Sequence, residues 1–165
     1  MTSPRPAFRP CRPDDLADLQ RLRASAFQPV FRSFADCVGE RIAVIAFARA
    51  DAEQARLLER ICREGSGHEV LVATVGGAIV GFVAFTLDVE ARIGEIGLNA
   101  VDPAHAGRGI GTRMYEHVLG IMKARGMAVA TVSTGGDPAH APARRAYEKA
   151  GFGAPIPSVS LYRLL

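Results

Sequence analysis

The spacing of apolar residues along the chain changes near residue 69. Before that point apolar residues recur every three or four positions, which is typical of amphipathic helices. After it, three segments carry the apolar and β-branched runs expected of strands, at 69–75, 78–87 and 93–101. Gly76-Gly77 lies between the first two and predicts a two-residue hairpin turn. The middle of the chain is therefore predicted to be a three-stranded meander.

The segment before the meander is predicted to be mainly helical. Phe8-Arg9 could form a short edge strand, and Asp14 or Asp15 can cap a helix that reaches Phe27. Pro29 is expected to end this helix, because proline lacks the backbone N–H that a helix interior needs. The chain would then pass through a loop at 28–33.

Aromatic residues border this loop, and they have two interpretations. Phe27 and Phe31 either fill the interior or line the rim of a substrate site. Helical spacing resumes at Phe34 and continues to Glu64. A D-x-x-Q pattern at Asp51 resembles a capping box, so we expect two helices in this region.

The segment after the meander predicts a helix at 110–125, a buried strand at 127–134, a short helix at 142–150 and a final strand at 158–164. The apolar stripe of the first of these helices consists of Ile110, Met114, Val118, Ile121 and Met122. Strict alternation within 93–101 would put Glu95 and Asn99 on one face, and Ile96, Leu98 and Ala100 on the other. The whole order predicts a mixed α/β sheet in a single domain over 1–165.

Composition excludes several classes of protein. Hydrophobic residues make up 48% and charged residues 22% of the 165 residues, which is typical of a globular chain. The net charge of +3 is spread along the sequence, and no run of basic residues alternates with aromatic ones, so a nucleic-acid partner is not expected. The three cysteines form no CxxC pair, so we expect neither a metal site nor a disulfide framework. No apolar run suits a signal peptide or a membrane span, so a cytoplasmic protein is expected.

The stretch 99–114, NAVDPAHAGRGIGTRM, carries the strongest functional signal. Gly107, Gly109 and Gly111 stand where a strand turns into a helix. Glycines at such a junction let backbone N–H groups face an anion at the positive end of the helix. The spacing differs from the G-x-G-x-x-G dinucleotide fingerprint, and the lysine of a Walker motif is missing. Other nucleotide binders are therefore disfavoured.

Two linked motifs indicate the kind of protein to which this turn belongs. LNAVDP at 98–103 is followed by AGRGIG at 106–111, and HAPARRAYEKAGF stands at 140–152. Together, residues 93–152 resemble the GNAT family of N-acetyltransferases. The resemblance implies a mixed, mostly antiparallel sheet flanked by helices, with a splayed strand pair that admits acetyl-CoA.

The resemblance also implies which residues hold the cofactor. The backbone of Asn99, Ala100 and Val101 would pair with the pantetheine amides. The pyrophosphate loop would consist of Gly107, Arg108, Gly109, Ile110, Gly111 and Thr112. Two positions depart from the family pattern, because Ala106 replaces a Gln or Arg and His140 replaces an Asn. Arg108 could supply the missing charge, and His140 could still form a hydrogen bond with the cofactor.

Catalytic roles follow from the same alignment. The resemblance to the family implies that Tyr147 is the general acid that protonates the departing thiolate, although it could instead be a core residue. Glu95 is the best candidate for a general base acting through water, unless it only binds a cationic substrate or faces solvent. Asp137-Pro138 is interpreted as loop punctuation rather than as a catalytic carboxylate.

The sequence thus predicts transfer of an acetyl group from acetyl-CoA to a primary amine by direct attack in a ternary complex, without a metal. The acceptor could be a small molecule or a peptide or protein amine. The alternative is a non-catalytic acyl-CoA-binding or sensor domain on the same fold. No membrane partner is expected, and the final strand could pair across a homodimer.

Overall fold

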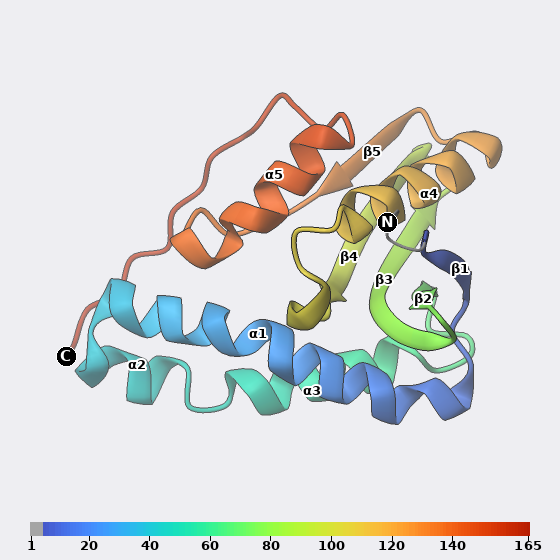
Figure 1. Ribbon diagram of the computed structural model, residues 1–165. Coiled ribbons are helices and arrows are strands. Elements are labelled where there is room, and N and C mark those ends of the chain that lie inside the picture. Colours follow the sequence, from blue (N-terminus) through green and yellow to red (C-terminus); the bar gives the residue numbers. More distant parts are fainter. Residues whose placement is uncertain (1–4) are drawn as a thin grey trace.

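One five-stranded sheet forms the centre of the computed structural model, which describes residues 5–165 (Figure 1). The strands follow chain order: β1 (Ala7–Pro10), β2 (Glu69–Val75), β3 (Ala78–Asp88), β4 (Ile93–Val101) and β5 (Val129–Val132). Neighbouring strands are antiparallel except β4 and β5, which are parallel. The predicted mixed, mostly antiparallel sheet is confirmed.

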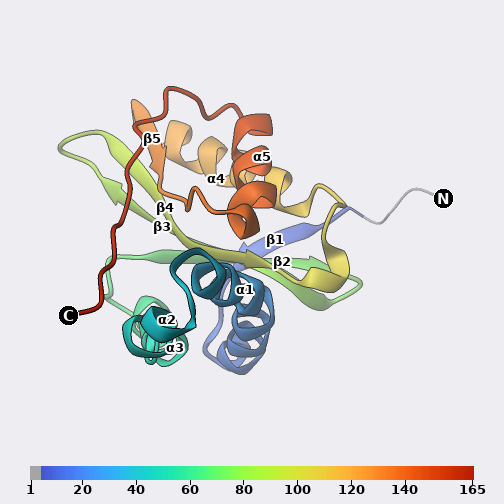
Figure 2. The same cartoon turned by 90° about the vertical axis from the view of Figure 1, so that its left-hand side faces the viewer.

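Helices cover both faces of this sheet (Figure 2). One face carries α1 (Leu16–Val38), α2 (Glu40–Ala46) and α3 (Ala50–Ile61), and the other carries α4 (Ile110–Ala124) and α5 (Ala141–Lys149). Three short 3-10 turns, η1 (Pro13–Asp15), η2 (Pro103–His105) and η3 (Pro138–His140), precede α1, α4 and α5.

Each face has its own apolar core because successive strand residues point to opposite sides. On the α4 and α5 side, Phe85 and Ile96 pack against Met114. On the α1 and α3 side, Phe82 packs with the fully buried Leu19 and Leu58. The predicted stripe of α4 is confirmed in that Ile110, Met114, Val118 and Met122 are all buried, with Ile121 partly buried.

The helix α1 is longer than predicted, and the expected break at Pro29 is wrong. Pro29 lies inside one continuous helix. Beyond it, Val30 is buried, so burial of the next turn compensates for the one backbone hydrogen bond that proline removes. The helix ends instead at Gly39, whose φ of 83° lies in the left-handed region.

The predicted split before Asp51 is correct, but the capping interpretation is wrong. Helix α3 begins at Ala50, and no side chain caps it. Asp51 instead accepts a hydrogen bond of 2.7 Å from the buried guanidinium of Arg23 in α1. The carboxylate thus joins two helices because it neutralises a charge that burial would otherwise destabilise.

The strand β4 contains one extra residue. The register pairs Phe85 with Ile96 and Val83 with Asn99. Two residues of β4, at 97–98, therefore oppose Ala84 of β3, which is a β-bulge.

This bulge overturns the predicted faces of the strand. Ile96 packs on the α4 side, whereas Leu98 and Ala100 pack on the α1 side. Because the bulge shifts the alternation by one residue, Glu95 and Asn99 also face opposite sides. The alternation resumes after the bulge with the two faces exchanged, so the predicted grouping of Ile96 with Leu98 and Ala100 is wrong.

The end of the chain also differs from the prediction. The strand β5 is only four residues long, and Val129 on it is 55% exposed rather than buried. No strand forms at 158–164, where Val159 and Leu161 are largely exposed. This tail contacts the helices through the ring of Tyr162, whose centroid lies 5.6 Å from that of Phe47. Its alternation of apolar residues has no neighbouring strand to pair with among the described residues.

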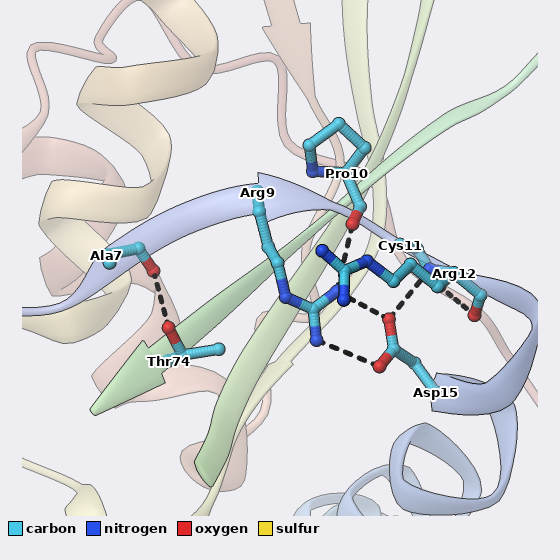
Figure 3. Close-up of polar contacts among 7 residues, drawn as sticks. All are labelled: Ala7, Arg9, Pro10, Cys11, Arg12, Asp15 and Thr74. Atoms are coloured by element: carbon cyan, nitrogen blue, oxygen red, sulfur yellow. Dashed lines mark hydrogen bonds and ion pairs between the residues drawn. The ribbon is translucent and has the colours of Figure 1, made fainter. Parts of the chain in front are cut away.

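A partly buried ion pair attaches β1 to η1, the turn that leads into α1 (Figure 3). The two guanidinium nitrogens of Arg9 donate to the two carboxylate oxygens of Asp15, at 2.7 and 2.9 Å. The backbone N–H of Arg12 also donates to this carboxylate, at 2.7 Å. Hydrogen bonding from Arg9, partly opposed by burial, lowers the pKa of Asp15 below its ordinary value.

Replacing Asp15 with Asn should lower the free energy of unfolding by about 1–3 kcal/mol near pH 7, because Arg9 and the Arg12 N–H lose a charged acceptor. The pKa of Asp15 is lowered in the folded state, so its stabilisation is present above about pH 4 and disappears as the pH falls through the folded pKa. Urea unfolding of wild type and Asp15→Asn should therefore converge at acid pH. Asp18→Asn, which removes an exposed pair with Arg21, is the control and should change stability by less than about 1 kcal/mol. A difference between wild type and Asp15→Asn that is independent of pH would contradict this prediction.

Candidate active site

The sheet opens between β4 and β5. Pairing between them covers only the first half of β4, from Ile93 to Ile96. Beyond that point β5 ends, and the second half of β4, at 97–101, pairs with β3 alone. The other edge of this half-strand is left for a ligand whose polar groups could pair with the backbone.

A cavity of about 680 Å³ lies at this opening. Its walls come from four places: the open half of β4, the glycine turn before α4, the end of β5 with the start of α5, and the middle of α1 with Ala26 and Phe27. Arg145 and Lys149 of α5 also line it, and no Asp or Glu is among the described residues of its wall. The wall therefore favours an anionic ligand.

The glycine turn adopts the conformation that the sequence predicts. Gly107 has a φ of 75° and Gly109 a φ of 73°, which residues with a side chain rarely adopt. Gly109 is also the N-cap residue of α4, which begins at Ile110. The first N–H groups of α4 have no partner within the helix, so the turn can bind an anion at its positive end.

The side chain of Asn99 connects the open strand to both neighbouring helices. Its amide nitrogen Nδ2 donates to the Gly97 carbonyl and to the hydroxyl of Tyr147, both at 2.9 Å. Its oxygen Oδ1 accepts from the hydroxyl of Tyr115 at 2.7 Å. Because a carbonyl can only accept, the Gly97 contact fixes which end of the amide is Nδ2. The direction of the other two bonds follows.

This arrangement leaves the hydroxyl proton of Tyr147 uncommitted. The Tyr147 oxygen accepts from Asn99, and no described residue accepts a hydrogen bond from it. The ring is only 6% exposed and lines the cavity. Tyr147 can therefore donate its proton to an atom in the cavity.

Burial controls the proton affinity of both tyrosines. It raises the pKa of Tyr147 above its ordinary value, although the hydrogen bond from Asn99 partly opposes it. Burial also raises the pKa of Tyr115. The two rings stack with centroids 4.5 Å apart. Both phenols are therefore protonated at neutral pH.

The predicted site residues fall into two groups. Those that line the cavity are Asn99, Ala100, Val101, Gly107, Gly109, Ile110, Gly111, Thr112, His140 and Tyr147. Glu95 and Arg108 are exposed and are not part of its wall. Glu95 precedes the bulge, in the half of β4 that still pairs with β5, and forms no ion pair among the described residues. Arg145 and Lys149, rather than Arg108, bring positive charge to the wall.

A model of the acetyltransferase (GNAT) family matches residues 27–152. The chain belongs to the GNAT acetyltransferase family. No curated protein matches its sequence. The family match covers the cavity, the glycine turn and the tyrosine, so the resemblance noted in the sequence is confirmed.

Solved structures share this GNAT fold. A ribosomal-protein-alanine N-acetyltransferase from Brucella melitensis is 20% identical with a TM-score of 0.64, over 96% of this chain and 99% of that one. The PaiA N-acetyltransferase from Thermoplasma acidophilum, solved with coenzyme A, is 19% identical with a TM-score of 0.68, over 90% and 89%. A GNAT-family protein from Desulfovibrio desulfuricans is 21% identical with a TM-score of 0.69, over 92% and 87%. At these identities the likeness establishes the fold.

Several residues of this site were missed in the sequence. Tyr115 is one helical turn beyond Gly111 on the buried side of α4, and its spacing from the glycines could have indicated it. Asp137 was interpreted as loop punctuation, and its side chain does accept from the Ala139 N–H as such a residue would. The carboxylate also pairs with His140, three residues later.

None of the helices between residues 5 and 165 is long and apolar enough to cross a bilayer.

Replacing Tyr115 with Phe should lower the free energy of unfolding by about 1–3 kcal/mol, because it removes the donor to Oδ1 of Asn99 in a buried site. The ring itself, and its stacking on Tyr147, would be kept. Thermal or urea unfolding measures the loss. Tyr162→Phe removes a hydroxyl from a residue 46% exposed and should leave stability unchanged. Equal effects of the two substitutions would contradict the proposed role of Asn99.

Proposed function

We propose that this GNAT protein transfers the acetyl group of acetyl-CoA to a primary amine. The observation that supports this most strongly is a phenol with a free proton beside the half of β4 whose second edge is open. A thioester whose amide-bearing arm pairs with that half-strand would bring its sulfur toward Tyr147. The reaction requires the amine and the thioester to be held together, and no covalent enzyme intermediate is needed.

The cavity wall suits coenzyme A chemically. The arm of the cofactor carries amides, which complement the open backbone edge of Asn99, Ala100 and Val101. Its phosphates are anionic, which complements the glycine turn and the cations of α5, Arg145 and Lys149. The solved PaiA relative is itself a complex with coenzyme A.

Tyr147 would act as the general acid. As the amine attacks the carbonyl carbon, the bond between that carbon and sulfur breaks and the sulfur becomes a thiolate. Tyr147 holds a proton at neutral pH because burial raises its pKa. The side-chain amide of Asn99, through Nδ2, then stabilises the phenolate that remains after the proton is donated.

The acceptor belongs to the class of primary amines. A screen that measures release of the CoA thiol should compare four kinds of amine: amino acids, polyamines, peptide N-termini and aminoglycosides. Glu95, exposed on β4, stays a prediction for the residue that helps to bind or deprotonate the amine.

Binding of CoA should depend on the left-handed conformation of Gly109. Gly109→Ala places a Cβ where φ is 73°, which should weaken CoA binding by about 5- to 30-fold, because holding the turn in this conformation then costs about 1–2 kcal/mol. Calorimetric titration with CoA measures this change. Gly120→Ala, within α4 and with open space around its Cβ, should bind CoA as wild type does. Absence of CoA binding by the wild-type chain would refute the proposed cofactor.

Replacing Tyr147 with Phe should lower kcat by about 10²–10⁴-fold, which is the usual contribution of a general acid. CoA affinity should remain close to that of wild type because the ring is kept. Thiol release with acetyl-CoA and the best amine of the screen measures the rate, and Tyr115→Phe is the control for a buried hydroxyl. An unchanged kcat in Tyr147→Phe at every pH would refute the general-acid role. Binding of CoA by the wild-type chain without transfer to any amine would favour the non-catalytic acyl-CoA binder.

A further inference from the structure

The loop between β5 and α5 is organised around the carboxylate of Asp137. This carboxylate accepts hydrogen bonds from the hydroxyl of Ser33 in α1, at 2.8 Å, and from the backbone N–H of Ala139, at 3.2 Å. It also pairs with Nδ1 of His140. The side chain of Asp137 is 9% exposed and that of His140 is 18% exposed. A nearly buried carboxylate therefore has the imidazole of His140 as a hydrogen-bond partner.

Two further residues hold this pair in place. A Cβ at Gly135 would collide with both the Asp137 carboxylate and the His140 ring, so only glycine fits there. Arg144 of α5 donates to the carbonyl oxygens of Gly135 and Asp137, at 2.5 and 2.9 Å. On the other side, the Phe34 ring of α1 stacks on the imidazole with centroids 6.0 Å apart. The orientation of His140 is thus fixed from three elements.

The pairing determines which nitrogen of His140 is available. Burial alone would raise the pKa of Asp137, but the hydrogen bonds from Ser33 and His140 outweigh it and lower that pKa. The carboxylate is therefore ionised and can only accept, so Nδ1 carries a proton. The other nitrogen, Nε2, has no hydrogen-bond partner among the described residues and is not shut away from solvent. Because His140 lines the cavity, Nε2 is the nitrogen that can act there.

We propose that His140 is the proton acceptor for the amine and that Asp137 is its positioning residue, an inference that rests on the proposed acetyl transfer. A primary amine is mostly an ammonium ion near neutral pH, and only the free amine can attack. Nε2 of His140 takes one proton from the ammonium nitrogen, whose lone pair then forms the new bond to the carbonyl carbon. The carbon–sulfur bond breaks, Tyr147 protonates the thiolate, and the second proton of the amine returns to Tyr147 by way of solvent. One proton is released overall, from His140.

The charges around His140 are compatible with this role. Asp137 in its own loop stabilises the imidazolium. From α5, Arg144 is directed at loop carbonyls, and Arg145 and Lys149 line the same cavity. From α1, the groups that face it are the hydroxyl of Ser33 and the ring of Phe34, which are uncharged. Glu95 is exposed and outside the cavity wall, so His140 is the better-placed acceptor.

His140→Asn is the informative substitution because asparagine retains a hydrogen-bonding group but cannot take up a proton. It should lower kcat/KM for the amine by about 10²-fold near pH 7, with the loss shrinking at high pH, where the amine is already deprotonated. CoA affinity by calorimetry should stay within about twofold. Asp137→Asn should lower kcat/KM in the same pH-dependent way but less. His68→Asn, at an exposed histidine outside the cavity wall, is the control and should leave kcat/KM unchanged. A loss in His140→Asn that is the same at every pH, or a pH-dependent loss in Glu95→Gln alone, would overturn the proposal.

The tautomer of His140 gives a readout that does not depend on catalysis. Nitrogen-15 NMR of the imidazole should show the neutral ring protonated at Nδ1 in wild type, and a shift toward the Nε2-protonated form in Asp137→Asn. A wild-type ring protonated at Nε2 would overturn the proposal. A wild-type chain that binds CoA but acetylates no amine would refute the proposed function. Transfer that proceeds equally in wild type and His140→Asn at every pH would refute only the role of His140.

Discussion

The extra residue in β4 is the constraint on which the site depends. A strand without the bulge would continue its alternation, and Asn99 would then face α1 instead of the tyrosines of α4 and α5. With the bulge at 97–98, the first half of β4 contributes Ile96 to the core under α4, and the second half contributes Ala100 to the core over α1. The bulge also falls where pairing with β5 ends, so Asn99 both lies in the open half of the strand and faces Tyr147.

The direction of hydrogen bonding then divides two similar tyrosines into different roles. Both are buried, and burial raises the pKa of each. The hydroxyl of Tyr115 donates its proton in a hydrogen bond to Asn99, so this proton is not available to a ligand. The hydroxyl of Tyr147 accepts a hydrogen bond from Asn99, so its own proton stays available. The chemical difference between them comes from a single amide, whose orientation is set by the Gly97 carbonyl. Sequence alone could distinguish them only through the family motif.

Elements with a strong local pattern could be predicted from the sequence, whereas features set by tertiary packing could not. The bounds of β2 and β4 agree with the prediction because their apolar runs end at turns. Gly107 and Gly109 have the positive φ angles that a glycine-rich turn predicts. The bulge could not be foreseen, because the run IGEIGLNAV is compatible with strict alternation. Pro29 does not end the helix, because the turn beyond it packs against the rest of the protein and buries Val30. The predicted strand at 158–164 does not form, because a strand needs a neighbouring strand to pair with as well as an alternating pattern.

The distribution of negative charge shows why the site places its carboxylates as it does. A carboxylate in the cavity wall would repel the phosphates of a cofactor, and the described wall holds Arg145 and Lys149 but no Asp or Glu. Asp137 pairs with His140, where its charge orients the ring and is itself stabilised by hydrogen bonds from Ser33 and His140. An imidazole in the wall can therefore accept a proton with the help of a carboxylate that the anionic ligand does not meet. Tyr147 in the same wall is uncharged before the reaction because burial raises its pKa, so the phenol does not oppose the binding of an anion.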